Sequence, residues 1–133
     1  MPLDVFWSRC EGQIVFGQND CCMVVADVIV AAGGPDMMAS YRGRYSTRLG
    51  FIRAFRKMGH VSLDAAVMAE FSRYGHLVSA PQDFDVAVVS YADGDRPMTS
   101  PAFFHSGFWC LRSERGMFVS KGSPDKIWRL RHA

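Results

Sequence analysis

The hydrophobic period of the chain changes near its middle, and this change limits the folds that the chain can adopt. Apolar side chains recur at helical spacing over residues 21–32, and shorter helical patterns cover residues 2–11, 48–58 and 63–74. Strand patterns that alternate or are rich in valine and aromatic residues follow over residues 85–91, 107–111, 117–121 and 127–131. Helices followed by antiparallel strands predict an α+β fold. The length of 133 residues suits one domain, over residues 1–133, with a substantial core.

Local signals set the expected ends of these elements. Asn19 or Asp20 can cap the helix that starts at residue 21, and Gly33-Gly34-Pro35 can end it. Thr47 and Ser62 can cap the next two helices, and Gly75 can close the last. We expect a loop over residues 93–97 and a strand that begins at His105 and runs on into its apolar neighbours.

Composition excludes several classes of protein. Fifteen Lys/Arg against thirteen Asp/Glu leave a net charge of +2, which does not favour nucleic acid as a partner. The four cysteines show no paired C-x-x-C spacing, so a structural zinc site has little support and we expect reduced thiols. Catalysis by a cysteine nucleophile, as considered below, would require no metal or organic cofactor. The start of the chain has no basic segment typical of a signal peptide, and its longest apolar run is too short for a membrane span. We therefore expect synthesis in a cytoplasm.

Cys21 is the candidate nucleophile. It follows a glycine-containing turn and opens an apolar helix, where unpaired N–H groups and the helix dipole favour the reactive thiolate. A cysteine at the start of an apolar helix face is more often a packing residue, and Cys10 and Cys110 are interpreted in this way. A nucleophilic thiol needs a base, and His105 is the best of the four histidines, because a histidine at a strand start can project from the sheet edge toward a helix N-terminus. A loop-end histidine that meets solvent is the alternative interpretation of His105.

Three segments carry a resemblance to a known group. They are Phe16-Gly17-Gln18-Asn19-Asp20-Cys21-Cys22, Tyr41-Arg42-Gly43-Arg44-Tyr45-Ser46-Thr47 and His105-Ser106-Gly107-Phe108-Trp109. Together they resemble the NlpC-type cell-wall cysteine peptidases, and within that superfamily a small tail family of phages and prophages. The resemblance implies a papain-like NlpC-type fold, with N-terminal helices packed on a C-terminal antiparallel sheet.

The resemblance also implies roles for individual residues. Cys21 would attack an amide of a peptidoglycan stem peptide, His105 would act as general base, and Ser120 would orient His105. Gln18 and Asp20 would support the oxyanion site. The superfamily usually has a stronger acceptor at the position of Ser120 and small residues at that of Cys22-Met23. The two hypotheses are therefore a peptidoglycan hydrolase of the virion tail and an inactive structural tail-tip component that keeps the fold.

A basic segment lies between residues 37 and 63. It holds no acidic residue and six basic ones, Arg42, Arg44, Arg48, Arg53, Arg56 and Lys57. A solvated helix face is one interpretation. The resemblance suggests another, in which the arginines dock on tail-tip or hub proteins or are attracted to the anionic cell wall. Binding to DNA is the least favoured, because no nucleic-acid motif accompanies the arginines.

Overall fold

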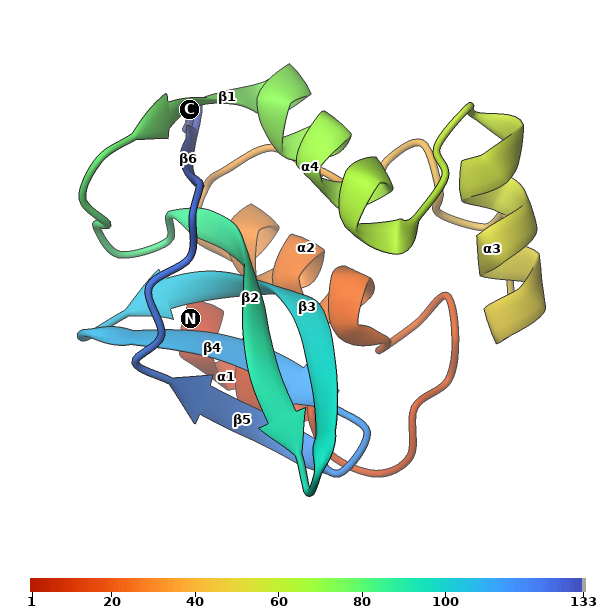
Figure 1. Cartoon of the computed structure of the whole chain (residues 1–133), viewed down its shortest axis with the longest axis horizontal. Helices are drawn as coiled ribbons and strands as arrows, with labels where there is room; N and C mark the ends of the chain where they lie inside the picture. The colour runs from red at the N-terminus through yellow and green to blue at the C-terminus, as the bar shows by residue number, and fades with distance from the viewer. Residues whose placement is uncertain (133) are drawn as a thin grey trace.

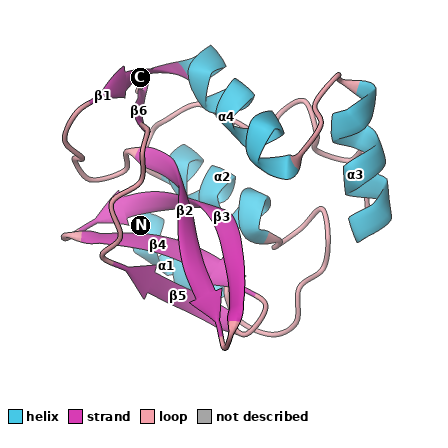
Figure 2. Ribbon diagram, viewed as in Figure 1, coloured by secondary structure: helices cyan, strands magenta, loops and turns pink. Residues whose placement is uncertain are grey.

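The α+β prediction is confirmed by a computed structural model, which describes residues 1–132 (Figures 1 and 2). Four helices accompany a six-stranded antiparallel sheet: the second and fourth helices contact the sheet, the first packs on the second, and the third packs on the fourth. The helices are α1 (Pro2–Arg9), α2 (Cys21–Ala31), α3 (Arg48–Lys57) and α4 (Leu63–Tyr74). The strands are β1 (Gly75–Val78), β2 (Val86–Asp93), β3 (Arg96–His105), β4 (Phe108–Ser113), β5 (Gly116–Ser120) and β6 (Ile127–Leu130). In residues 1–132 we find no helix with the length and apolar character of a membrane span.

The sheet has the order β1-β6-β2-β3-β4-β5. Strands β2 to β5 form a meander of hairpins, whereas β6, the last strand, inserts between β1 and β2. This insertion pairs β6 with the strand that directly follows α4, and α4 contacts β1, β2, β3 and β6.

The predicted caps are confirmed. The side chains of Asp20, Thr47 and Ser62 accept hydrogen bonds from backbone N–H groups in the first turns of α2, α3 and α4. Gly75 follows α4 but also begins β1, which the sequence did not predict as a strand. Its position leaves no room for a side chain, since a Cβ atom would lie 2.3 Å from the carbonyl oxygen of Arg129.

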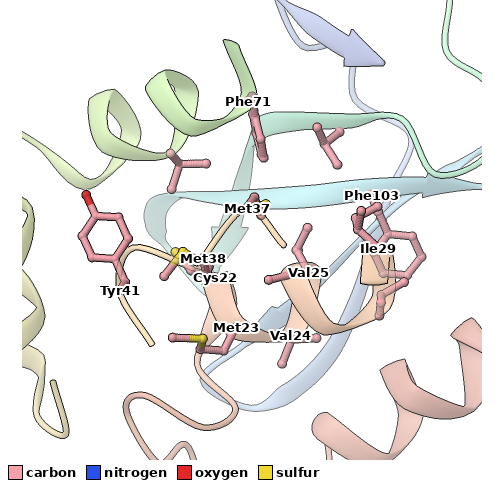
Figure 3. Close-up of a cluster of buried hydrophobic side chains, with 14 of the residues drawn as sticks. Cys22, Met23, Val24, Val25, Ile29, Met37, Met38, Tyr41, Phe71 and Phe103 are labelled. Carbon is pink, nitrogen blue, oxygen red and sulfur yellow. The ribbon is translucent and has the colours of Figure 1, made fainter. Parts of the chain in front are cut away.

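Helix α2 forms the centre of the main core. Seven of its residues are buried, because α1, α4, the residue 37–41 segment and the sheet surround it (Figure 3). Phe6 of α1 packs edge-to-face on Phe103 of β3, with ring centroids 4.9 Å apart. A second, smaller cluster fills the opposite, concave face of the sheet, around Trp109 and Leu111.

The predicted loop over residues 93–97 is wrong. Only Gly94 and Asp95 form the turn, with Gly94 at a φ of 61°, and β3 begins at Arg96. The sequence did not predict β3, because it contains two prolines, Pro97 and Pro101, and proline is normally excluded from paired strands. They are tolerated because β4 pairs only with residues 103–105, so the side of β3 that faces β4 is unpaired at both prolines.

The expected position of His105 at the start of a strand is also wrong. His105 is the last residue of β3 and pairs with Phe108, the first residue of β4. Ser106 and Gly107 both have positive φ, at 51° and 87°, and form the tight two-residue turn between these strands. The predicted strands over residues 85–91, 107–111, 117–121 and 127–131 correspond to β2, β4, β5 and β6.

A buried arginine joins α1 to the meander. The guanidinium of Arg112 in β4 is 1% exposed and donates to the carbonyl oxygens of Arg9, at 2.7 Å, and Gly12, at 2.6 Å. These carbonyls follow the end of α1, where a positive charge is favoured by the helix dipole. Arg112 thereby fixes the segment that leads from α1 toward α2.

We expect Arg112→Met to lower the free energy of unfolding by about 2–3 kcal/mol, because it removes charge-assisted hydrogen bonds from a buried position. Urea denaturation measures this change. Arg115→Met is the matched control in the same hairpin: its side chain is 80% exposed and pairs only with Asp93, so the expected loss is below about 1 kcal/mol. Equal losses in the two variants would contradict the structural role of Arg112.

Candidate functional site

The candidate site begins with the buried carboxylate of Asp20, which is 1% exposed. One oxygen accepts from the N–H groups of Cys22 and Met23, both at 3.1 Å. The other accepts from the N–H of Gly17, at 2.8 Å, and from the hydroxyl of Tyr45, at 2.7 Å. The four donors come from the turn before α2, from α2 itself and from the residue 41–47 segment, so one side chain holds three parts of the chain together.

Gly17 and Tyr45 fit this arrangement closely. Gly17 has a φ of 87°, and a Cβ atom there would lie 2.4 Å from the carbonyl oxygen of Tyr45. Burial and the neighbouring Asp20 raise the pKa of the Tyr45 hydroxyl far above its ordinary value, so Tyr45 stays a hydrogen-bond donor. The motif residues Gly17, Asp20 and Tyr45 therefore act as one structural unit, a role that sequence reasoning did not assign to Tyr45.

Cys21 is the first residue of α2 and is half-buried. Cys22 beside it is completely buried, and the two sulfur atoms lie 3.9 Å apart. The hydrogen bond with Cys21 and burial raise the pKa of the Cys22 thiol well above its ordinary value. Burial also raises the pKa values of Cys10 and Cys110 to about 11, as expected of packing residues. Cys21 is thus the accessible thiol among the four.

The structure does not bring His105 to Cys21. Nε2 of His105 lies 3.9 Å from a carboxylate oxygen of Asp83, and its ring packs near Phe84. His105 is the last residue of β3 and stands at the β3–β4 turn, whereas Cys21 opens α2. In Figure 1 the β3–β4 turn and the start of α2 lie toward opposite sides of the molecule.

Ser120 does not face His105 either. Ser120 lies on β5 opposite Trp109, which in turn lies opposite Phe104. Residues paired across strands point to the same face, and neighbours along a strand point to opposite faces. The side chain of Ser120 is therefore on the other face of the sheet from that of His105, and its hydroxyl accepts from the N–H of Gly122. Asp83, which His105 contacts, lies in a loop for which the sequence pattern predicted no role.

Two of the N–H groups expected to support an oxyanion are already engaged. Asp20 accepts from the N–H groups of Cys22 and Met23, the first-turn donors that would face an oxyanion beside Cys21. Gln18 is exposed, and its backbone N–H donates to the carbonyl oxygen of Val15 within the turn. The arrangement stabilises the start of α2 and engages two of the N–H groups beside Cys21.

Asp20, Cys21 and Cys22 also form a cluster with the residue types of a metal site, since one ligand atom from each lies within 4.8 Å of the others. Both oxygens of Asp20 already accept two hydrogen bonds each, and the raised pKa of Cys22 favours its protonated form. Metal ligands must instead be deprotonated and free to coordinate. The cluster fits a helix cap better than a metal site.

The predicted docking arginines separate into two kinds. Arg42 donates to Asp36 at 2.6 Å and to Asp27 at 2.7 Å, and Arg9 also donates to Asp27 at 2.9 Å. Asp27 of α2 thus binds both Arg9 of α1 and Arg42 of the residue 36–42 segment. The remaining predicted arginines are exposed and make no ion pair with any carboxylate in residues 1–132; they are Arg44, Arg48, Arg53 and Arg56.

We expect Tyr45→Phe to lower the free energy of unfolding by about 1–3 kcal/mol, because it removes a hydrogen bond from a buried charged acceptor. Thermal unfolding followed by circular dichroism measures the change. Tyr74→Phe is the control, since its hydroxyl makes no hydrogen bond within residues 1–132. A Tyr45→Phe protein as stable as wild type would show that Asp20 does not depend on this donor.

Alkylation separates Cys21 from the other thiols. In the native protein we expect iodoacetamide to label one thiol, Cys21, because Cys10, Cys22 and Cys110 are 9%, 0% and 6% exposed. All four thiols should react after denaturation. Mass spectrometry counts the labels, and Cys21→Ser should abolish the native label; labelling that persists in this variant would show that another thiol is accessible.

Comparison with known proteins places the chain in a family without assigning it an activity. None of the curated proteins matches it, and none of the solved structures does. Residues 7–130 match a family described as Domain of unknown function (DUF6950). This span includes the Asp20 cap, Cys21, His105 and the exposed arginines, and it covers most of the chain. The chain belongs to the DUF6950 family.

Proposed function

We propose that this domain is a structural docking component of a phage or prophage tail tip, with a papain-like, NlpC-type fold that does not hydrolyse peptidoglycan. The placement of His105 at the β3–β4 turn, toward the opposite side of the molecule from the start of α2 and Cys21, is the observation that carries this proposal (Figure 1). The resemblance supplies the tail setting, in which the protein is made in the host cytoplasm and ends in the virion. The proposed partners are tail-tip or hub proteins.

The separation argues against hydrolysis for a physical reason. A general base must lie within hydrogen-bond reach of the nucleophile, directly or through one water molecule. Cys21 begins the buried helix α2, and His105 closes a hairpin of the sheet that α2 packs against. Bringing the two side chains together would require sliding of the central core helix along β3. A close-packed interior opposes such a displacement.

The other histidines do not replace His105 in the structure of residues 1–132. His76 lies on β1 opposite Arg129, and His132 lies 3.4 Å from the carbonyl oxygen of Ala32, at the other end of α2 from Cys21. His60 lies beside the end of α3 and affects the pKa of Glu70. No imidazole is therefore positioned to take the proton of Cys21.

The segments behind the resemblance have structural contacts that explain their presence without catalysis. Gly17 and Tyr45 bind Asp20, and Arg42 binds Asp27 of α2. These contacts fix the residue 41–47 segment to α2 and place α3 after it. The fold thus presents α3 and its exposed arginines on a rigid base, as a docking component requires.

A cysteine endopeptidase of peptidoglycan is the second candidate function. The half-exposed thiol of Cys21 at the start of α2 favours it, because a helix N-terminus stabilises a thiolate. This candidate needs a base other than His105 and an oxyanion site other than the capped N–H groups. It would use no metal or organic cofactor.

We expect neither wild type nor Cys21→Ala to reduce the turbidity of purified sacculi, because no histidine of residues 1–132 is positioned as a base for Cys21. Lysozyme on the same sacculi shows that the substrate is cleavable. Clearing by wild type that disappears in Cys21→Ala would overturn the proposal and establish the endopeptidase. His105→Ala tested in parallel would then show whether this histidine takes part.

A further inference from the structure

We propose that a groove on α3 binds an acidic, amphipathic peptide segment of a partner protein. The groove has a volume of about 650 Å³ and is lined by Arg44, Gly50, Arg53, Ala54, Lys57 and Met58. This inference rests on the proposed docking function and names the surface and the chemistry of its partner.

Helix α3 is attached to the molecule through one face only. Phe51 and Phe55 are buried, and the ring of Phe51 stacks on Tyr45 with centroids 4.2 Å apart. Because Tyr45 also binds Asp20, the anchored face is tied to the rigid start of α2. Figure 1 shows α3 at the edge of the molecule, away from the sheet. The groove lies on a face that residues 1–132 leave open.

The charge of this face is not balanced within the molecule. Arg44, Arg53 and Lys57 are exposed, and none of them forms an ion pair with a carboxylate in residues 1–132. Arg42, in the same basic segment, is neutralised by Asp27 and Asp36. Three like charges around one groove repel one another, and carboxylates of a partner would relieve that repulsion.

The groove also offers apolar surface to its occupant. Gly50 and Ala54 form part of its wall, and the exposed Met58 adds a flexible apolar side chain. Leu49, which is 55% exposed, lies on the neighbouring surface of α3. Cations beside apolar groups match a peptide with glutamate or aspartate next to leucine-like side chains, as in helix-in-groove recognition.

A long polyanion fits this surface less well than a peptide does. Residues 37–63 hold six of the fifteen Lys/Arg and none of the thirteen Asp/Glu, so the rest of the chain is net negative. A nucleic acid or an extended anionic wall polymer that reached beyond α3 would be repelled by the net negative charge of the rest of the chain. Phosphate contacts also gain nothing from the apolar part of the groove. The complementary ligand is therefore a short acidic segment.

The test is a binding titration followed by fluorescence anisotropy. The probe is a fluorescein-labelled synthetic peptide with glutamates one helical turn apart and leucines beside them. We expect Arg53→Glu/Lys57→Glu to weaken its binding about tenfold or more, since two favourable charges become repulsive. The control, Arg96→Glu/Lys126→Glu, makes the same charge change at exposed positions outside the groove and should weaken binding less than about threefold.

Two further peptides test whether binding depends on the charge of the peptide and of the groove. A peptide with lysine in place of glutamate should bind the Arg53→Glu/Lys57→Glu protein better than wild type, which also shows that the variant is folded. A glutamine peptide should bind wild type weakly. The inference would be overturned if the two charge variants weakened binding equally, or if the lysine peptide did not prefer the Arg53→Glu/Lys57→Glu protein. It would also be overturned if a single-stranded oligonucleotide bound more tightly than the peptide through Arg53 and Lys57. Cys21-dependent clearing of sacculi would refute the proposed function alone, because Cys21 does not line the groove.

Discussion

The buried carboxylate of Asp20 is the interaction on which the rest of the structure depends. A charged group removed from water is costly unless its hydrogen-bonding capacity is met, and four donors meet that of Asp20. These donors fix the turn at Gly17, the start of α2 and Tyr45. Tyr45 then stacks on Phe51, so the position of α3 depends on the same carboxylate. One buried charge thus connects the core helix to the helix that carries the exposed arginines.

This arrangement also limits the chemistry of Cys21. The residue occupies the first turn of α2, where thiolates are favoured, yet two of the N–H groups there are bound by Asp20. Stability of the helix start and catalysis compete for these two donors. His105 stands at the β3–β4 turn, away from the start of α2 (Figure 1), so the surroundings of Cys21 suit a structural role better than amide hydrolysis.

Much of the fold could be predicted from the sequence, because its signals are local. The caps Asp20, Thr47 and Ser62 mark the helix starts, and alternating or aromatic runs mark β2, β4, β5 and β6. Strand β3 escaped prediction because Pro97 and Pro101 are normally excluded from paired strands, and only the short partner β4 makes them acceptable. The error moved His105 from the end of one strand to the start of the next, and the predicted catalytic pairing depended on that position.

The sequence by itself determined the fold class and the capped starts of α2, α3 and α4, with Asp20 as one of the caps, since periodicity and capping act between residues close in the chain. Only the tertiary structure decided which of these residues meet. Strand pairing places Ser120 and His105 on opposite faces of the sheet. Ion pairs with Asp27 and Asp36 neutralise Arg42, whereas Arg53 and Lys57 form no ion pair within residues 1–132 and line the groove. Such outcomes depend on register and on contacts between distant segments, which no local pattern encodes.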